Sequence, residues 1–114
     1  MADCLFCSIA TGEIPGDVVA RTDRALAFRD INPQAPTHVL VVPIEHYANV
    51  AELVRADDTL FAEVWRLACD VADSEGIAES GWRAVTNTGA DGGQTVDHVH
   101  LHVLGGRHLT WPPG

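Results

Sequence analysis

The feature that most constrains how this chain can fold is the run His98–Val103, in which histidine alternates with an aliphatic residue. Successive side chains of a β-strand point to opposite faces of the sheet, so His98, His100 and His102 would share one face. In a helix the same spacing would scatter the three imidazoles around the axis. The run therefore predicts a strand whose aliphatic face packs on a core and whose histidines line a polar site.

The rest of the chain predicts four more strands and one long helix. Asp57 and Asp58 can begin the helix, because acidic residues are favourable at a helix N-terminus, and Gly76 is a natural end. Between them, apolar residues recur every three or four positions and give the helix one apolar face. The five expected strands are 17–21, 24–30, 38–42, 82–87 and 98–103.

Short connections between these elements favour antiparallel neighbours in the sheet. We therefore expect an α+β fold, in which one five-stranded, mainly antiparallel sheet carries the long helix on one face. Residues 38–42 are an almost unbroken aliphatic run, which is typical of a central strand covered on both faces. Residues 4–11 are expected to form a short helical turn or an irregular start, and residues 49–54 one or two helical turns.

Length and charge narrow the class of protein. A chain of 114 residues suits one domain, so we expect residues 1–114 to form a single domain that includes the C-terminal tail. The net charge of −9 disfavours binding to long nucleic acid, which depends on many basic contacts to phosphates. No stretch has the length and apolarity of a membrane span, and the N-terminal residues lack a secretion signal. We expect a cytoplasmic protein with reduced thiols and no membrane partner.

The histidine face allows three interpretations. It could be an exposed strand face, or two histidines two residues apart could join a third ligand in a catalytic zinc site. The third interpretation is phosphoryl chemistry, since a neutral imidazole is a good nucleophile and a neighbouring one can donate a proton. The loop 88–95 favours this third interpretation, because its glycines let backbone N–H groups approach an anion beside the histidines.

The run His98–Val103 resembles the signature of the histidine triad superfamily of nucleotide hydrolases and transferases. The resemblance to its nucleotide-binding branch covers nearly the whole chain. It extends to Phe28–His38, Asp91–Val96, Leu104–Arg107 and the closing Trp111–Gly114. The transferase branch ends its triad with glutamine, so the histidine at position 102 points to hydrolysis.

This resemblance implies an activity and a role for each residue of the site. His100 would attack the α-phosphorus of a purine nucleoside 5′-phosphoramidate, and water would hydrolyse the nucleotidyl-histidine intermediate to the nucleoside monophosphate. His102 would hold a phosphate oxygen, His38 would assist proton transfer, and Asp30 would bind the ribose hydroxyls. The implied contacts to the phosphate or leaving group are Asn87, Gly93 and Thr95. The implied walls of the nucleobase pocket are Leu5, Phe6, Ile9, Phe28, Ile31 and Leu40.

The resemblance also implies a homodimer, because members of the family pair so that the C-terminal tail of one copy reaches the site of the other. Trp111 would then lie on the leaving-group side of the partner's site. Two alternatives to the phosphoramidate hydrolase remain. The first is a hydrolase of dinucleoside polyphosphates, and the second is a nucleotide-binding interaction or regulatory protein.

Cys4 and Cys7 form a C-x-x-C motif that can be a redox pair or half of a structural zinc site. No strand can precede Cys4, which argues against the redox motif. His46 and His98 can complete a set of two cysteines and two histidines, and some members of the superfamily carry a similar zinc site. We therefore expect structural Zn²⁺ with no open coordination position, while the chemistry itself requires no cofactor. His108 is an exposed alternative ligand.

Overall fold

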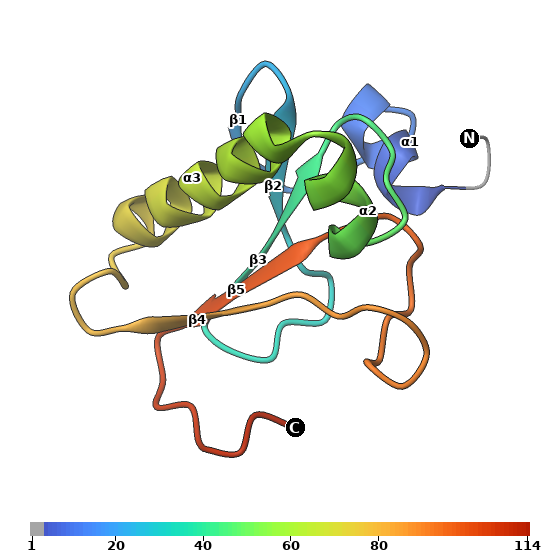
Figure 1. Cartoon of the computed structure of the whole chain (residues 1–114). Helices are drawn as coiled ribbons and strands as arrows, with labels where there is room; N and C mark the ends of the chain where they lie inside the picture. The colour runs from blue at the N-terminus through green and yellow to red at the C-terminus, as the bar shows by residue number, and fades with distance from the viewer. Residues whose placement is uncertain (1–3) are drawn as a thin grey trace.

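The computed structural model describes residues 4–114, which form three helices and five strands (Figure 1). No helix within that part of the chain is long and apolar enough to cross a membrane. The helices are α1 (Leu5–Thr11), α2 (Val50–Ala56) and α3 (Asp58–Ser74). The strands are β1 (Val18–Arg21), β2 (Ala25–Arg29), β3 (Thr37–Pro43), β4 (Trp82–Val85) and β5 (Leu101–Gly105).

The five strands form one sheet in the order β1-β2-β3-β5-β4, and every neighbouring pair is antiparallel. This confirms the predicted α+β fold. β3 lies at the centre of the sheet, and all seven of its residues are buried. The aliphatic run therefore marks a strand covered on both faces, as expected.

The two faces of the sheet bury different side chains. On one face, Val39 and Val41 of β3 join Val64 and Val71 of α3 in the main core. On the other face, Leu40 packs with Phe6 of α1 and with other apolar residues of that cluster. Figure 1 shows the long helix α3 and the short helix α1 on either side of β2 and β3. The face opposite α3 carries Leu40 together with His102, its neighbour on β5.

The long helix begins and ends where the sequence predicts. The carboxylate of Asp57 accepts a hydrogen bond from the backbone N–H of Leu60, which satisfies a free donor of the first turn. At the other end, Gly76 has a φ of +76°. The Gly76 N–H donates to the Asp73 carbonyl, and the Ile77 N–H donates to the Ala72 carbonyl. This pair of bonds is the Schellman motif, and it explains why a glycine ends the helix.

The last strand begins three residues later than the sequence predicts. β5 starts at Leu101, which pairs with Val41. If the ladder continued, Val99, two residues before Leu101, would pair with Pro43, which has no N–H to donate. The N–H of Val99 donates instead to the Tyr47 carbonyl at 2.7 Å. The alternation of faces nevertheless persists outside the strand, since Val99 packs in an apolar cluster beneath α2 and α3.

Candidate active site

Three imidazoles lie side by side on the sheet face opposite α3. His102 of β5 sits beside Leu40 in the sheet, and its ring centroid is 5.0 Å from that of His100 and 5.1 Å from that of His38. His100 precedes β5, and Phe6 of α1 packs edge-on against its ring. The structure brings together the three histidines that the family resemblance assigned to one site, although His38 and His102 are 64 residues apart in the chain.

The hydrogen bonds of His100 determine which of its ring nitrogens is free. Its Nδ1 lies 2.8 Å from the backbone carbonyl oxygen of His98. A carbonyl oxygen only accepts, so Nδ1 carries the hydrogen and donates it. The Nε2 of a neutral His100 therefore keeps its lone pair. The carbonyl of His100 accepts a hydrogen bond from the Thr86 hydroxyl at 3.0 Å, which holds the backbone at this residue.

The opposite tautomer follows for His38 and His102. The backbone N–H of Gln34 donates to the Nδ1 of His38 at 3.0 Å, so the hydrogen of a neutral His38 lies on Nε2. That Nε2–H points at the Nδ1 of His102, 2.9 Å away. His102 then accepts through Nδ1 and carries its own hydrogen on Nε2. His102 can therefore donate a hydrogen bond from Nε2, because its Nδ1 is occupied by His38.

Burial keeps this pair neutral. Desolvation lowers the pKa of His38, although the nearby Asp30 carboxylate, 3.4 Å from its Nε2, acts in the opposite sense. Desolvation and the neighbouring imidazoles lower the pKa of His102 to about 4. Both rings are therefore neutral near pH 7, which is the state that the relay of tautomers requires.

A cavity of about 660 Å³ opens beside His100 and His102. Every expected substrate contact except Trp111 lines it. These residues are Leu5, Phe6, Ile9, Phe28, Asp30, Ile31, Leu40, Asn87, Gly93 and Thr95. Trp111 lies outside this cavity and is 81% exposed. The arrangement places an apolar compartment next to two imidazoles, with a carboxylate and a glycine-rich loop at its edge.

The loop that follows α1 also lines the cavity, which was not predicted from the sequence. Ile14, Pro15, Gly16 and Asp17 all contribute to the wall. A side chain at Gly16 would meet the Ile9 side chain at 2.8 Å, so this glycine lets the loop approach α1 closely. The available signal was Ile14, an apolar residue set between polar neighbours and a Pro-Gly turn.

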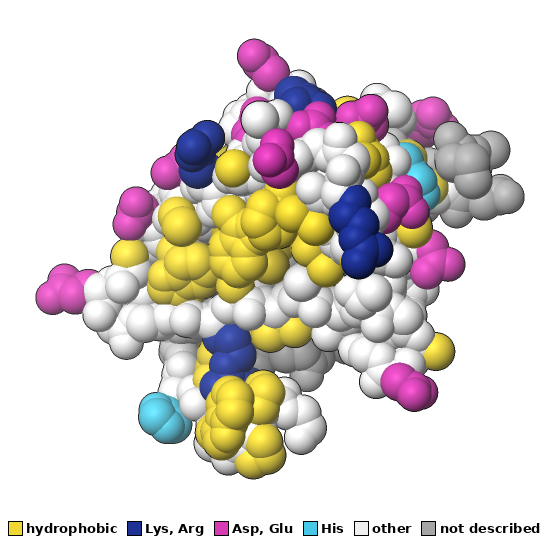
Figure 2. All heavy atoms as spheres, viewed as in Figure 1, with side chains coloured by type: hydrophobic (Ala, Val, Ile, Leu, Met, Phe, Trp, Pro, Cys, Tyr) yellow, Lys and Arg dark blue, Asp and Glu magenta, His cyan; other side chains and the backbone are white. Residues whose placement is uncertain are grey.

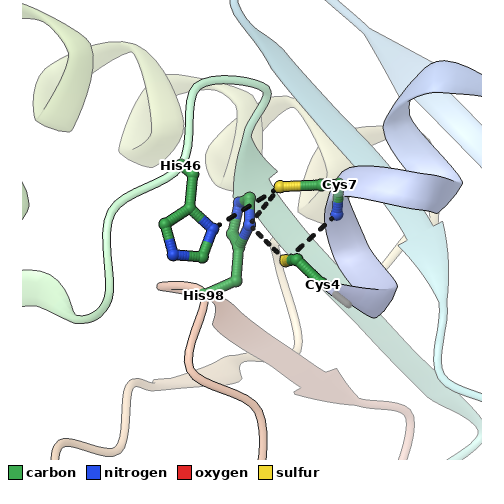
Figure 3. Close-up of side chains that lie close together, drawn as sticks. All are labelled: Cys4, Cys7, His46 and His98. Carbon is green, nitrogen blue, oxygen red and sulfur yellow. Dashed lines mark hydrogen bonds between the residues drawn. The ribbon is translucent and has the colours of Figure 1, made fainter. Parts of the chain in front are cut away.

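The four residues of the expected metal site also converge (Figure 3). Their ligand atoms all lie within 4.8 Å of one another. The Nδ1 of His98 is 3.3 Å from the Cys4 sulfur and 3.5 Å from the Cys7 sulfur, and the Nδ1 of His46 is 3.5 Å from Cys7. The alternative ligand His108 is exposed and lies outside this group.

The other hydrogen bond of His98 is also one that suits a metal ligand. The Nε2 of the fully buried His98 donates to the Pro43 carbonyl at 2.8 Å, which leaves the lone pair of Nδ1 facing the two sulfurs. Histidines that bind metals commonly donate their other ring hydrogen in this way. Two cysteines and two histidines are also a donor set that zinc favours.

A second group of possible metal ligands, formed by Asp30, His38 and His102, does not pass the same test. Their ligand atoms also lie within 4.8 Å of one another. The Nδ1 of His38, however, accepts a hydrogen bond from a backbone N–H, so its Nε2 carries a hydrogen and has no lone pair for a metal. This group is therefore a hydrogen-bond relay.

Comparisons with known proteins agree with this geometry. The model of the HIT domain family matches residues 11–109, and the chain belongs to that family. A HIT family hydrolase from Legionella pneumophila superposes with a TM-score of 0.95 at 51% identity, covering 98% of this chain and 100% of its own. The purine nucleoside phosphoramidase of Escherichia coli K12 is 42% identical over 94% of this chain and 90% of its own. An uncharacterised HIT-like protein of Synechococcus elongatus is 47% identical over 98% of this chain and 97% of its own. The chain thus has the fold of the HIT family hydrolases.

We predict that the three active-site histidines have two different tautomers at pH 7. Long-range ¹H–¹⁵N spectra should show His100 with its hydrogen on Nδ1, and His38 and His102 with theirs on Nε2. His102 should stay neutral at pH 5.5, where a histidine with the ordinary pKa of about 6.5 is mostly protonated. Because His102 binds a proton near pH ~6.5 in the unfolded chain and only near its lowered pKa of about 4 in the folded chain, acidification across that range should lower the free energy of unfolding. A His100 hydrogen on Nε2 would contradict the assignment.

Proposed function

We propose that this protein hydrolyses purine nucleoside 5′-phosphoramidates and releases the nucleoside monophosphate. The observation that carries the proposal is the hydrogen bond from the Nδ1–H of His100 to the His98 carbonyl, because it directs a free imidazole lone pair at the cavity. The similarity to the phosphoramidase of Escherichia coli supports the choice of substrate.

In the first step, the Nε2 of His100 attacks the α-phosphorus and the P–N bond breaks. The leaving nitrogen takes a proton from solvent and departs as an amine, the nucleotide stays bonded to His100, and the water that attacks in the second step returns a proton to solvent. Protonation matters because an amine leaves far more easily than an amide anion. His102, which carries a hydrogen on Nε2 and is backed by His38, is placed to donate to a phosphate oxygen. Water then attacks the same phosphorus, which breaks the P–N bond to His100 and yields the nucleoside monophosphate.

The remaining contacts suit a nucleotide. The N–H groups of the glycine-rich loop and the Thr95 hydroxyl would face the phosphate, since both Gly93 and Thr95 line the cavity. Asp30 would accept hydrogen bonds from the ribose hydroxyls at the edge of the cavity. Phe6, Phe28 and the other apolar walls would enclose the base. Local donors of this kind allow a chain with a net charge of −9 to bind an anion.

Replacing His100 with Asn should abolish turnover, because the amide cannot form the covalent intermediate. We expect release of AMP from adenosine 5′-phosphoramidate to fall by about 10³-fold or more, with the fold and thermal stability retained. The control is Asp70→Asn, which introduces the same side chain at an exposed position of α3 outside the cavity and should keep the parent activity. Hydrolysis of diadenosine polyphosphates should be measured in parallel, because it distinguishes a phosphoramidate hydrolase from a dinucleoside polyphosphate hydrolase. An active His100→Asn variant would refute the nucleophile, and an inactive parent would indicate a nucleotide-binding protein without this chemistry.

We further propose that Cys4, Cys7, His46 and His98 bind one structural Zn²⁺. A zinc ion held by four protein ligands activates no water, so its contribution would be to hold α1, the end of β3 and the histidine segment together. The His98 carbonyl that orients His100 belongs to a proposed ligand. The metal would therefore influence the nucleophile only through the position of this backbone.

The purified protein should contain about one zinc ion per chain by elemental analysis. Cys7→Ser should lose the metal and lower the Tm by about 5 °C or more, since 1 kcal/mol corresponds to about 4–8 °C in a domain of this size. Cys69→Ser is the control, because Cys69 is a free, exposed cysteine on α3. A metal-free parent protein, or equal effects of the two substitutions, would refute the site.

We also propose that the protein forms a homodimer whose tails complete the two sites. Figure 2 shows hydrophobic side chains gathered over the face between α3 and β4. Trp65, Trp82 and Ala84 pack on the main core from these elements but are only partly buried. Trp111 is exposed on its own copy, which leaves it free to reach a partner.

Light scattering should therefore give twice the chain mass of 12.2 kDa. In the dimer, Trp111→Ala should alter kcat or KM for bulky amine leaving groups and leave the affinity for AMP unchanged. A monomer with full activity would refute this proposal.

A further inference from the structure

The glycine-rich loop, residues 88–95, contributes Gly93 and Thr95 to the cavity, yet no helix or strand supports it. Most of its residues are exposed. Two backbone hydrogen bonds lie within it, from Gly93 N–H to the Ala90 carbonyl and from Gln94 N–H to the Gly89 carbonyl, both at 3.0 Å. Such a loop needs a further constraint if its N–H groups are to meet a phosphate in a fixed geometry.

The side chain of Gln94 provides that constraint. Its Oε1 accepts a hydrogen bond from the Gly89 N–H at 3.0 Å, at the start of the loop. Its Nε2 donates to the Val96 carbonyl at 3.0 Å, just after the loop, and to the Ala48 carbonyl at 2.7 Å, in a different part of the chain. One carboxamide therefore closes the loop on itself and attaches it to a neighbouring segment. All three partners are backbone groups, so both of its donors and its acceptor oxygen are used.

The segment that Gln94 reaches, residues 46–48, also contacts the metal-ligand cluster and the segment His98–His102. The ring of His46 lies in the cluster with Cys7. The Tyr47 carbonyl accepts from the N–H of Val99, between His98 and the nucleophile. The Ala48 carbonyl accepts from Gln94. Three consecutive residues thus contact the metal-ligand cluster, the histidine segment and the glycine-rich loop.

We infer that Gln94 is a positioning residue, which holds the glycine-rich loop in register with the His98–His102 segment by its bond to Ala48. It touches no substrate in this proposal. It acts through the backbone at Gly93 and through Thr95, which both line the cavity, so that the Thr95 hydroxyl can donate to the phosphate as charge develops on its oxygens. The inference rests on the proposed function for its kinetic consequence, whereas the conformational consequence can be measured on the free protein.

The test is Gln94→Met, which keeps the length of the side chain and removes all three of its hydrogen bonds. We expect kcat for adenosine 5′-phosphoramidate to fall about ten-fold or more with KM changed less than about three-fold, because donors aimed at developing charge act mainly in the transition state. The Gly89 amide should exchange its hydrogen about ten-fold faster or more, since it loses its acceptor. The control is Thr88→Met, which introduces the same side chain at an exposed neighbouring position of the loop.

A second variant, Gln94→Glu, separates the two halves of the interaction. It keeps an acceptor for Gly89 but loses the donors to Ala48 and Val96, so Gly89 should stay protected while kcat still falls. Thr88→Glu controls for the added charge. Unchanged kcat or unchanged Gly89 exchange in Gln94→Met would overturn the inference, as would a loss of protection throughout the chain that accounts for the lost activity.

The same variants distinguish this inference from the proposed function. If the parent protein releases no AMP, the proposed activity fails, and exchange of the Gly89 amide in the free protein then tests Gln94. The Gly89 amide of Gln94→Met should still exchange about ten-fold faster than in the parent and in Thr88→Met. Equal exchange rates would overturn the inference.

Discussion

The site depends on the hydrogen bonds of one fully buried histidine. His98 donates from Nε2 to the Pro43 carbonyl, faces two cysteine sulfurs with Nδ1, and accepts from His100 through its own carbonyl. A buried imidazole without partners would be costly, so these contacts define its position closely. The position of His100, the proposed nucleophile, depends on His98, because the His98 carbonyl accepts the Nδ1 hydrogen of His100 and so sets its tautomer. The cluster of possible metal ligands and the active-site histidines that we propose are therefore connected through His98.

Pro43 decides how the histidine segment meets the sheet. Because it has no N–H, it ends the ladder between β3 and the last strand at the pair Val41 and Leu101. The freed Pro43 carbonyl binds His98, and the freed Val99 N–H binds Tyr47. The segment before β5 thereby leaves the sheet ladder and gains contacts to the metal-ligand cluster and to residues 46–48. A regular strand over the same residues would have used those backbone groups for pairing.

Much of this fold was predictable because local signals agreed with it. Asp57 caps the start of the long helix, and Gly76 ends it in a Schellman motif. The aliphatic run of residues 38–42 marked the central strand. Strand ends were less predictable, since the late start of β5 depends on which residue Pro43 would oppose. The wall formed by residues 14–17 was missed for a similar reason. Its approach to the cavity depends on Gly16 contacting Ile9, which no periodicity reveals.

The sequence by itself determined the set of chemical groups and the faces on which they lie. Alternation from His98 to Val103 places imidazoles on one side and aliphatic residues on the other, because a pleated backbone has a period of two. The tertiary structure alone decided what each imidazole can do. Gln34 N–H on His38 and the His98 carbonyl on His100 assign opposite tautomers to chemically identical rings. The Pro43 carbonyl holds the hydrogen of His98 on Nε2, which leaves its Nδ1 free as a candidate metal ligand. The Gln34 N–H occupies the Nδ1 of His38, which makes that ring part of a hydrogen-bond relay. The tautomer of a histidine is set by the group that folding places beside one of its ring nitrogens. For His38 that group is the Gln34 N–H, which lies far from the run His98–Val103 in the sequence.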